Sequence, residues 1–588
     1  MSQQENHSGK ILDFKTLRRI FVFVKPHLRL FYLILFLTLF KGLMAPLLPF
    51  LIRYTVDDYI MVGDLPGLNQ MALLLVAVIL IQALLDYFHA FLSGDLGQRV
   101  VKDVRTEVFR HIIGMRLQYF DRTPIGRLVT RNVSDIESLS DIFTNGLANI
   151  IGDLLQIIFI LLAMFWLDWR LTLVTLSVLP ILIISTYIFK EKIKAAFNDV
   201  RNAVSNLNSF VQEHITGMYI VQIFNSEDRE YQKFSEINKA HRSANIRTVL
   251  YYSIYFPVAE VVTAAGTGLL VWYGARQVLG GEIELGVLIA FLMFLAMFFR
   301  PVRLIADRFN ALQMGVVSSD RILKLLDTEA QIESKGTFAP SGIQGKVDFK
   351  SVWFAYDLPE YVLKDVSFSV KAGQTVALVG ATGAGKSSII NLITRFYDIQ
   401  KGRILIDDRP IAEYDLTNLR THIGMVLQDV FLFSGSILDN ITLHNPSITL
   451  EQAQRAADLV GARAFIERLP GGFHYKVMER GATLSVGQRQ LISFVRAMVY
   501  DPKILILDEA TSSVDGETEA LIQNAIEQMM QGRTSIVIAH RLATIQKADQ
   551  IIVLDKGQIK EIGTHQSLLA EGGIYAHLHD VQYRQLVE

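Results

Sequence analysis

The sequence predicts a six-helix α-helical transmembrane domain with long cytoplasmic helical extensions, fused to an α/β domain built around a phosphate-binding loop. Apolar residues concentrate before about residue 316, in segments long enough to cross a bilayer. Further along, short apolar runs alternate with amphipathic stretches, which is typical of an α/β domain. We expect a transmembrane domain over residues 1–328, a linker over 329–345 and an α/β P-loop nucleotide-binding domain over 346–588.

The composition supports a membrane protein. Of 588 residues, 51% are hydrophobic and 20% are charged, and the mean hydropathy is +0.31, which is too apolar for an ordinary soluble enzyme. The net charge of −1 gives no basic character that would suggest nucleic-acid binding. The chain has no cysteine, which excludes disulfides, thiolate metal sites and cysteine nucleophiles.

The N-terminal stretch does not resemble a signal peptide. It begins with ten largely polar residues and has no small-residue cleavage pattern. Charged and apolar residues then alternate over residues 11–25, which predicts an amphipathic helix lying on the cytoplasmic membrane face. An ordinary surface helix is the alternative.

The charges of the loops predict the orientation of the spans. Residues 94–142 carry eight Lys or Arg and residues 190–250 carry nine, whereas residues 54–68 carry none. Basic loops remain cytoplasmic, and six spans then place both termini on the cytoplasmic side. We expect this multi-pass chain in the cell inner (plasma) membrane. The expected spans cover approximately residues 30–53, 70–92, 143–167, 171–189, 251–273 and 285–305.

The two basic loops should form helices that leave the membrane and return. Legs of about 20 residues would reach roughly 30 Å into the cytoplasm. Turning points are expected near residues 117–126 and 217–228, and the tips should dock on a nucleotide-binding domain, near the segment after Gln428. A connecting helix is expected over residues 316–328.

Ionisable residues inside the predicted spans have two interpretations. They would either line a substrate pathway, or pair between helices and reach toward a span end. Both interpretations stay open for each residue, and Pro257 and Pro301 could kink their helices. The residues are Lys41, Asp86, His89, Glu260 and Arg300.

A G-x-x-x-x-G-K-S motif over residues 380–387 marks a phosphate-binding loop. An apolar run over residues 375–379 predicts a buried strand before it, and residues 388–396 predict a helix after it. The helix N-terminus and inward-turned backbone N–H groups would hold phosphates, with Lys386 on the β/γ-phosphates and the Ser387 hydroxyl on Mg²⁺. The candidate residues are Gly380, Thr382, Gly383, Ala384, Gly385, Lys386, Ser387 and Ser388.

A second motif completes a nucleotide-hydrolysing core. Residues 504–507 predict a buried strand that ends in Asp508 and Glu509. Asp508 would act on Mg²⁺ through water, and Glu509 would polarise the attacking water as a general base.

Further motifs resemble the ATP-binding cassette (ABC) family. Leu484-Ser485-Val486-Gly487-Gln488 resembles its signature motif, and six spans followed by one cassette resemble the half-transporters among its exporters. The resemblance covers nearly the whole chain. Other matches are Phe354-Ala355-Tyr356 for the adenine-stacking aromatic, Gln428 for the Q-loop, Ser512-Ser513-Val514-Asp515 for the D-loop, His540 for the switch histidine and Glu479-Arg480-Gly481 for the exporter contact loop.

The resemblance implies ATP and Mg²⁺ as cofactors and a dimer with two sandwiched nucleotides. Tyr356 would stack on adenine, Gln428 would join Ser387 and Asp508 at Mg²⁺, and His540 would hold the water with Glu509. The signature of the second chain would complete each site. The implied contacts there are Ser485, Gly487, Gln488 and Asp515.

The implied function is ATP-driven export of a hydrophobic or amphipathic compound, a drug or lipid, by alternating access. The partner would be a second half-transporter, expected to be an identical chain. The alternatives are an ATP-gated channel or regulatory membrane subunit, and one half of a heterodimeric exporter. Val486 departs from the glycine commonest in the family, and altered signatures often accompany mixed pairs. A soluble ATPase does not fit six spans, and fusion of the spans to the cassette disfavours an importer.

Overall fold

The computed structural model describes residues 14–142, 144, 147–329, 336–508, 516–538 and 542–587. Contacts divide the chain into two units, the first holding residues 1–113 and 125–328, and the second holding residues 114–124 and 329–588. The short segment 114–124 therefore packs with the C-terminal unit, although the helices on either side of it in sequence belong to the first.

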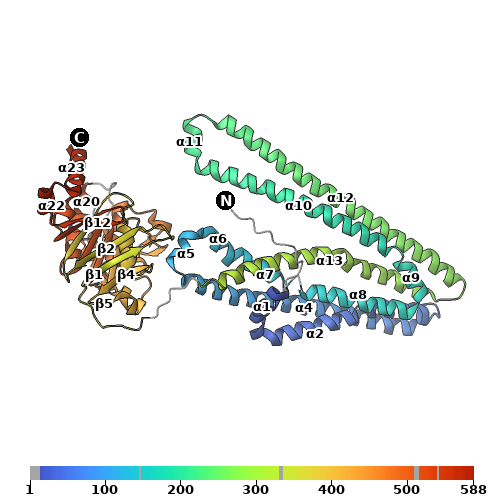
Figure 1. Ribbon diagram of the computed structural model, residues 1–588. Helices are drawn as coiled ribbons and strands as arrows, with labels where there is room; N and C mark the ends of the chain where they lie inside the picture. Colours follow the sequence, from blue (N-terminus) through green and yellow to red (C-terminus); the bar gives the residue numbers. More distant parts are fainter. Residues whose placement is uncertain are drawn as a thin grey trace. The chain divides into compact units, whose positions relative to one another are not determined.

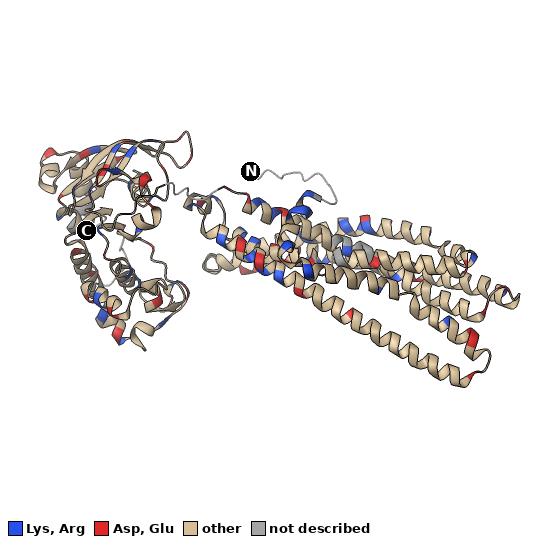
Figure 2. Ribbon diagram, turned by 90° about the horizontal axis from the view of Figure 1, so that it is seen from below, with Lys and Arg blue, Asp and Glu red and all other residues tan. Residues whose placement is uncertain are grey.

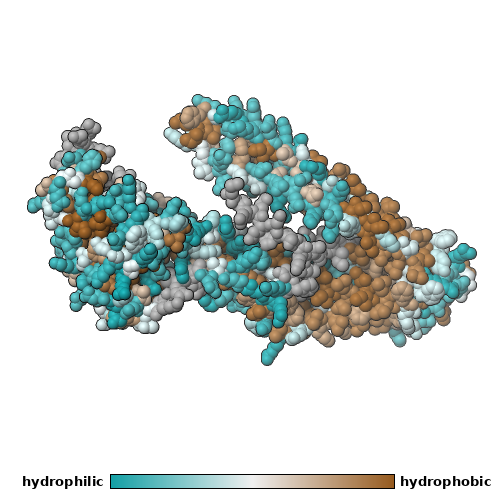
Figure 3. Space-filling view, in the orientation of Figure 1, coloured by the Kyte–Doolittle hydropathy of each residue, from teal (hydrophilic) through white to brown (hydrophobic). Residues whose placement is uncertain are grey.

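The first unit is helical, and its described residues contain six stretches long and apolar enough to cross a membrane, as predicted (Figure 1). Figure 2 shows long helical stretches of ribbon without the colours of Lys, Arg, Asp or Glu, and Figure 3 shows hydrophobic side chains gathered over α2 and α8. The helices are α1 (Phe14–Val24), α2 (Leu28–Met44), α3 (Leu47–Thr55), α4 (Leu65–Ile113), α6 (Ile125–Thr130), α7 (Ile136–Asp141), α8 (Leu147–Leu167), α9 (Trp169–Leu176), α10 (Leu179–Thr216), α11 (Met218–Ile223), α12 (Glu227–Leu279) and α13 (Leu285–Leu326).

The predicted helical extensions are present. Helix α4 has 49 residues and α12 has 53, so they are about 73 and 80 Å long, well beyond the roughly 30 Å of a bilayer core. Helices α10 and α12 lie side by side, and the short α11 joins their ends (Figure 1). The turning point predicted near residues 217–228 is this short helix.

Two helices differ from expectation. The connecting helix expected over residues 316–328 is the end of α13, which runs unbroken from the sixth span with Pro301 inside it. Helix α1 buries Ile20 and Val24 where it packs against α4 and α13, and Arg19 binds both carboxylate oxygens of Asp327 at 2.6 and 2.7 Å. The helix therefore turns Ile20 and Val24 to protein, a packing that the sequence does not predict, whereas Val22 stays exposed.

The second unit is built on two main sheets. The six-stranded sheet has the order β12-β11-β3-β10-β9-β6, parallel except for β12, and the antiparallel four-stranded sheet has the order β2-β1-β4-β5. The strands are β1 (Val347–Phe354), β2 (Leu363–Val370), β3 (Thr375–Val379), β4 (Lys401–Ile406), β5 (Arg409–Pro410), β6 (Ile423–Val426), β7 (Gly435–Ser436), β8 (Lys476–Val477), β9 (Ile504–Asp508), β10 (Thr534–Ile538), β11 (Gln550–Asp555) and β12 (Gln558–Gly563).

Both faces of the six-stranded sheet are covered, which explains the continuous apolar runs of its strands. Val376 and Leu378 of β3 pack into a core shared with α14 and the four-stranded sheet, while Ala377 and Val379 face a core shared with α19 and α20. The helices of this unit are α5 (Leu117–Arg122), α14 (Lys386–Ile393), α15 (Leu416–Thr421), α16 (Ile437–Thr442), α17 (Leu450–Leu459), α18 (Arg463–Arg468), α19 (Val486–Met498), α20 (Gly516–Met530), α21 (Leu542–Gln546), α22 (His565–Glu571) and α23 (Ile574–Val587).

The strand register brings the sequence motifs to one edge. Ile538 at the end of β10 pairs with Leu378 of β3 and with Asp508 of β9, and Val426 of β6 pairs with Leu507. Because these strands are parallel, the segments that follow all four leave from the same edge, where open α/β sheets bind ligands.

A close approach of helices in the first unit gives a test of packing. A Cβ at Gly274 of α12 would lie 2.5 Å from Leu288 Cδ1 of α13, whereas a Cβ at Gly268 of α12 has nothing within 4 Å. We expect Gly274→Leu to destabilise the transmembrane unit by about 1–3 kcal/mol through overpacking. Thermal unfolding in lipid nanodiscs measures this, with Gly268→Leu as the matched control. Equal unfolding midpoints for the two variants would contradict the packing.

Candidate nucleotide-binding site

The phosphate-binding loop joins β3 to α14 and depends on its glycines. Gly380, Gly383 and Gly385 have φ values of 155°, 82° and 104°, which side chains rarely adopt. A Cβ at Gly380 would also collide with the Leu554 carbonyl oxygen, and one at Gly385 would lie 2.6 Å from Leu363 Cδ2. The loop conformation therefore requires glycine at the first and last of these positions.

The N-terminus of α14 is open to an anion. The helix begins at Lys386, two residues earlier than predicted, and Gly385 at the N-cap supplies no side-chain hydrogen bond to the first turn. First-turn N–H groups carry partial positive charge and lack intrahelical partners, so this geometry fits a phosphate. Thr382, Gly383 and Ser387 are exposed, whereas Ala384 and Ser388 are buried.

Lys386 holds the loop from within. Its Nζ donates to the carbonyl oxygens of Gly380 at 2.6 Å and Ala381 at 3.1 Å. Burial lowers the pKa of Lys386, and the charge of Asp508 opposes that effect. The ammonium group thus lies beside the loop and near the carboxylate at the end of β9, where a bound phosphate would exchange carbonyl contacts for stronger, charge-assisted ones.

The predicted metal ligands come from three elements around the same edge. Ser387 lies in the first turn of α14 and Gln428 follows β6, and both are exposed, while Asp508 ends β9 and is half-buried. Hydroxyl, amide and carboxylate oxygens are the ligands that Mg²⁺ prefers, so the residue types fit that ion. Glu509, Asp515 and His540 lie outside the described residues, although the strands before Glu509 and His540 end at this edge.

Tyr356 lies next to the helix that follows the phosphate-binding loop. Its hydroxyl is 3.2 Å from Ser388 Oγ, and Asn391 Nδ2 donates to it, also at 3.2 Å. The ring meets Phe354 and Tyr397 edge to face at 4.7 and 4.9 Å between centroids. An aromatic ring held beside the phosphate site is placed to contact a nucleotide base.

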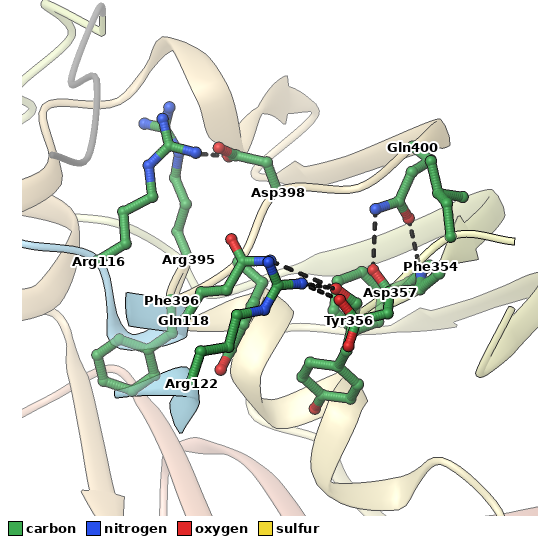
Figure 4. A pocket seen from close by; sticks show the side chains of 13 residues that line it. Arg116, Gln118, Arg122, Phe354, Tyr356, Asp357, Arg395, Phe396, Asp398 and Gln400 are labelled. Atoms are coloured by element: carbon green, nitrogen blue, oxygen red, sulfur yellow. Dashed lines mark hydrogen bonds and ion pairs between the residues drawn. The ribbon is translucent and has the colours of Figure 1, made fainter. Parts of the chain in front are cut away.

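Helix α5 packs beside Tyr356 and Tyr397 in this unit (Figure 4). Arg122 Nη2 donates to the Tyr356 carbonyl at 3.0 Å and forms an ion pair with Asp357, and Gln118 Nε2 donates to the same carbonyl at 3.3 Å. The Tyr397 hydroxyl donates to Asp121. Burial, and then this hydrogen bond, raise the pKa of Tyr397, so the phenol stays a proton donor at neutral pH.

The first predicted turning point therefore does pack with the nucleotide-binding unit, but its hydrogen bonds go to Tyr356, Asp357 and Tyr397. The expected target, the segment after Gln428, receives none of those described for α5. Sequence analysis did not single out Asp121, Arg122 or Tyr397. Asp121 and Arg122 stand just before Thr-Pro at the predicted tip, but nothing local indicates their partners.

The signature segment forms the N-terminus of α19. Ser485 Oγ accepts from Gln488 N at 3.2 Å, and Gln488 Oε1 accepts from Ser485 N at 3.0 Å, which is a capping box. Gly487 is buried, whereas Val486 is 48% exposed, so the branched side chain projects outward from this unit. No described hydrogen bond links Ser485 or Gln488 to the phosphate-binding loop of the same chain.

A helical unit with six candidate spans, joined in one chain to a P-loop sheet domain, defines a membrane-embedded nucleotide hydrolase. Residues 31–302 match the family described as ABC transporter transmembrane region, and residues 363–512 match the family described as ABC transporter. The chain belongs to the ABC transporter family and has the fused layout of its half-transporters.

Curated relatives resemble almost the whole chain. An uncharacterised ABC transporter ATP-binding protein of Bacillus subtilis, YknV, is 38% identical over 97% of this chain and 95% of its own length. A probable multidrug resistance ABC transporter ATP-binding/permease protein of the same organism, YheH, is 38% identical over 89% of this chain and 78% of its own. An ATP-dependent lipid A-core flippase of Syntrophus aciditrophicus is 33% identical over 97% and 94%.

The position of Lys386 predicts its effect on nucleotide affinity. Lys386→Ala removes one charge-assisted phosphate contact, so we expect the Kd for ATP to rise by about tenfold or more. Titration with a fluorescent ATP analogue measures the affinity. Lys371→Ala, at an exposed turn after β2, is the control and should bind like the parent chain. An unchanged Kd for Lys386→Ala would contradict the assigned site.

Proposed function

We propose that the protein couples ATP hydrolysis to export of a hydrophobic or amphipathic compound, a drug or lipid, by alternating access. The observation that carries this is the sheet edge, where the phosphate-binding loop, Gln428 and Asp508 meet in the same chain as six candidate spans. Relatives whose names specify multidrug export or lipid A-core flipping support this class of cargo. The proposed location is the cell inner (plasma) membrane, with both termini cytoplasmic.

The proposed roles in hydrolysis follow from position. Lys386 and the first turn of α14 hold the β/γ-phosphates, and Tyr356 contacts adenine. Ser387, Gln428 and Asp508 supply oxygens to Mg²⁺, which neutralises charge on the phosphates. Glu509 is the general base, and His540 orients the water and the γ-phosphate.

The proposed partner is a second, identical chain. Each nucleotide would lie between the phosphate-binding loop of one chain and Ser485, Gly487, Gln488 and Asp515 of the other. The capping box supports this, because it fixes Ser485 at the N-terminus of α19, where an anion can bind, and no described hydrogen bond joins Ser485 or Gln488 to the phosphate-binding loop of the same chain. The exposed position of Val486 lets the branched side chain project without crowding its own helix.

The second cytoplasmic tip supports assembly as well. Helix α11 and the residue after it expose five large apolar side chains, and the segment after Gln428 exposes two phenylalanines. Such side chains on a cytoplasmic tip are typical of docking surfaces. We propose that α11 docks on the partner's segment after Gln428. The side chains are Met218, Tyr219, Ile220, Ile223 and Phe224 in the tip, and Phe431 and Phe433 in the segment.

An ATP-gated channel or regulatory subunit and one half of a heterodimer are the other candidates. No Walker residue departs from the hydrolytic pattern, which favours repeated turnover and two equivalent sites over gating or a mixed pair. Ion conductance without cargo movement would support the channel. ATPase activity that requires a different half-transporter would support the heterodimer.

Glu509→Gln tests the proposal. The variant lacks the general base, so ATP turnover should fall by about 10²–10⁴-fold. It keeps the phosphate-binding loop and Lys386, so the affinity for ATP should be retained. The measurements use the purified chain in lipid vesicles. They are the mass of the assembly, the rate of ATP hydrolysis and the ATP-dependent uptake of a labelled cargo. Glu519→Gln, on α20, is the matched control. Near-parental turnover in Glu509→Gln would assign the base elsewhere, and a monomer without ATPase activity would refute the homodimer.

A further inference from the structure

A charged cavity lies inside the transmembrane unit, apart from the nucleotide site. It has a volume of about 350 Å³ and is lined by residues of α2, α4, α8 and α13. Five of the lining side chains are ionisable, which is unusual among membrane-spanning helices and generally marks function. They are Lys41, Asp86, Asp153, Arg300 and Arg308.

With both termini cytoplasmic, as proposed, the cavity falls at the depth of the cytoplasmic leaflet. Arg300 comes 15 residues after Leu285 at the outer start of α13, about 22 Å along the helix. Asp153 comes 14 residues before Leu167 at the outer end of α8, about 21 Å along it. In a bilayer core of about 30 Å, both lie in the inner half. An amphipath in the cytoplasmic leaflet would hold its head group at this level.

The charges of the cavity do not cancel. Lys41 Nζ lies 2.6 Å from Asp86 Oδ1, and Arg308 Nε lies 2.7 Å from Asp153 Oδ2, so these four form two ion pairs. Arg300 is a fifth, exposed side chain that has no ion pair among the described residues. Three cations and two anions leave one positive charge, which is costly at this depth unless a counter-charge binds.

The rest of the lining suits a hydrocarbon. Met44, Leu85 and Met297 line the same cavity, and methionine side chains adapt to chains of different shape. The amide of Gln82 is already engaged, because its Nε2 donates to the Met44 carbonyl at 2.9 Å. The cavity thus places the guanidinium of Arg300, which has no ion pair among the described residues, beside apolar side chains that adapt to different chains.

We infer that the exported compound is an amphipath with an anionic head group, and that Arg300 recognises this group. A guanidinium binds phosphate, carboxylate or sulfonate with paired hydrogen bonds, which no other group of this cavity offers free of an ion pair. This inference deepens the proposed export function and depends on it. Lys41–Asp86 and Arg308–Asp153 keep the remaining charges neutral, so that one negative charge matches the cavity.

The test uses the full-length chain in vesicles of phosphatidylcholine, with four probes. Fluorescent short-chain phosphatidylglycerol and anilinonaphthalene sulfonate are anions, one a lipid and one a free compound. Fluorescent phosphatidylcholine with the same acyl chains and tetraphenylphosphonium are the zwitterionic and cationic counterparts. We expect both anions to stimulate ATP turnover and to be moved, at half-maximal concentrations about tenfold or more below those of their counterparts. Stimulation by only one anion identifies lipid or free compound as the source.

Variants at Arg300 separate recognition from folding. In Arg300→Gln the half-maximal concentration for anions should rise by about tenfold or more, while the response to tetraphenylphosphonium is retained. Arg300→Lys should restore most of the anion response. Arg276→Gln, an exposed arginine at the end of α12, is the matched control and should behave like the parent.

Two results overturn the inference without affecting the proposed function. One is a parent chain that transports tetraphenylphosphonium or phosphatidylcholine as well as it transports anions. The other is an unchanged anion response in Arg300→Gln, which would make Arg300 structural. The comparison of probes in the parent chain stands even if Arg300→Gln fails to fold. A parent chain that moves no probe and shows no ATP-dependent transport would instead refute the export function itself.

Discussion

The register of the parallel strands is the constraint on which the nucleotide site depends. Ile538 of β10 lies between Leu378 of β3 and Asp508 of β9, so the ends of three strands fall at one level. A slip of one residue would turn each buried side chain to the other face and displace Asp508 from Lys386. The two apolar cores fix this register, because alternate residues of each strand fill them.

Helix α5 connects this site to the transmembrane helices along the chain. It lies between α4 and α6, which belong to the first unit, yet it packs with the nucleotide-binding unit. Arg122 and Gln118 donate to the carbonyl of the residue proposed to contact adenine, and Asp121 binds the hydroxyl of Tyr397, whose ring meets that of Tyr356. A change in the position of Tyr356 on nucleotide binding would thus displace α5 through these hydrogen bonds. Because α4 and α6 are joined to α5 in the chain, the displacement would move their ends as well.

Local patterns allowed much of the fold to be predicted. The strand over residues 375–379 and the six spans follow from apolar runs of the right length, and they match the structure. The start of α14 was placed two residues late, because the phosphate-binding loop, rather than side-chain propensity, sets its N-cap at Gly385. The packing of α1 was not predictable, since an apolar stripe fits protein and membrane equally well.

Contacts between distant residues could not be predicted. Tyr397 and Asp121 are 276 residues apart, and Arg19 and Asp327 are 308 apart, so neither pair leaves a local signal. For the ionisable residues of the spans, the sequence left pathway and pairing open. The structure pairs Lys41 with Asp86 and leaves Arg300 without an ion pair among the described side chains. The roles of Glu509 and His540 rest on the motifs, since these residues lie outside the described part.

The central proposal is that ATP turnover drives cargo movement, and we propose α5 as the link because the chain joins it directly to α4 and α6. The number of cargo molecules moved per ATP hydrolysed, measured in sealed vesicles for Arg122→Ala, tests it most directly. The account predicts that this ratio falls several-fold while ATP affinity is kept, and that Arg110→Ala, which removes an ion pair within α4, leaves the ratio unchanged. A ratio in Arg122→Ala equal to that of the parent chain would contradict the claim.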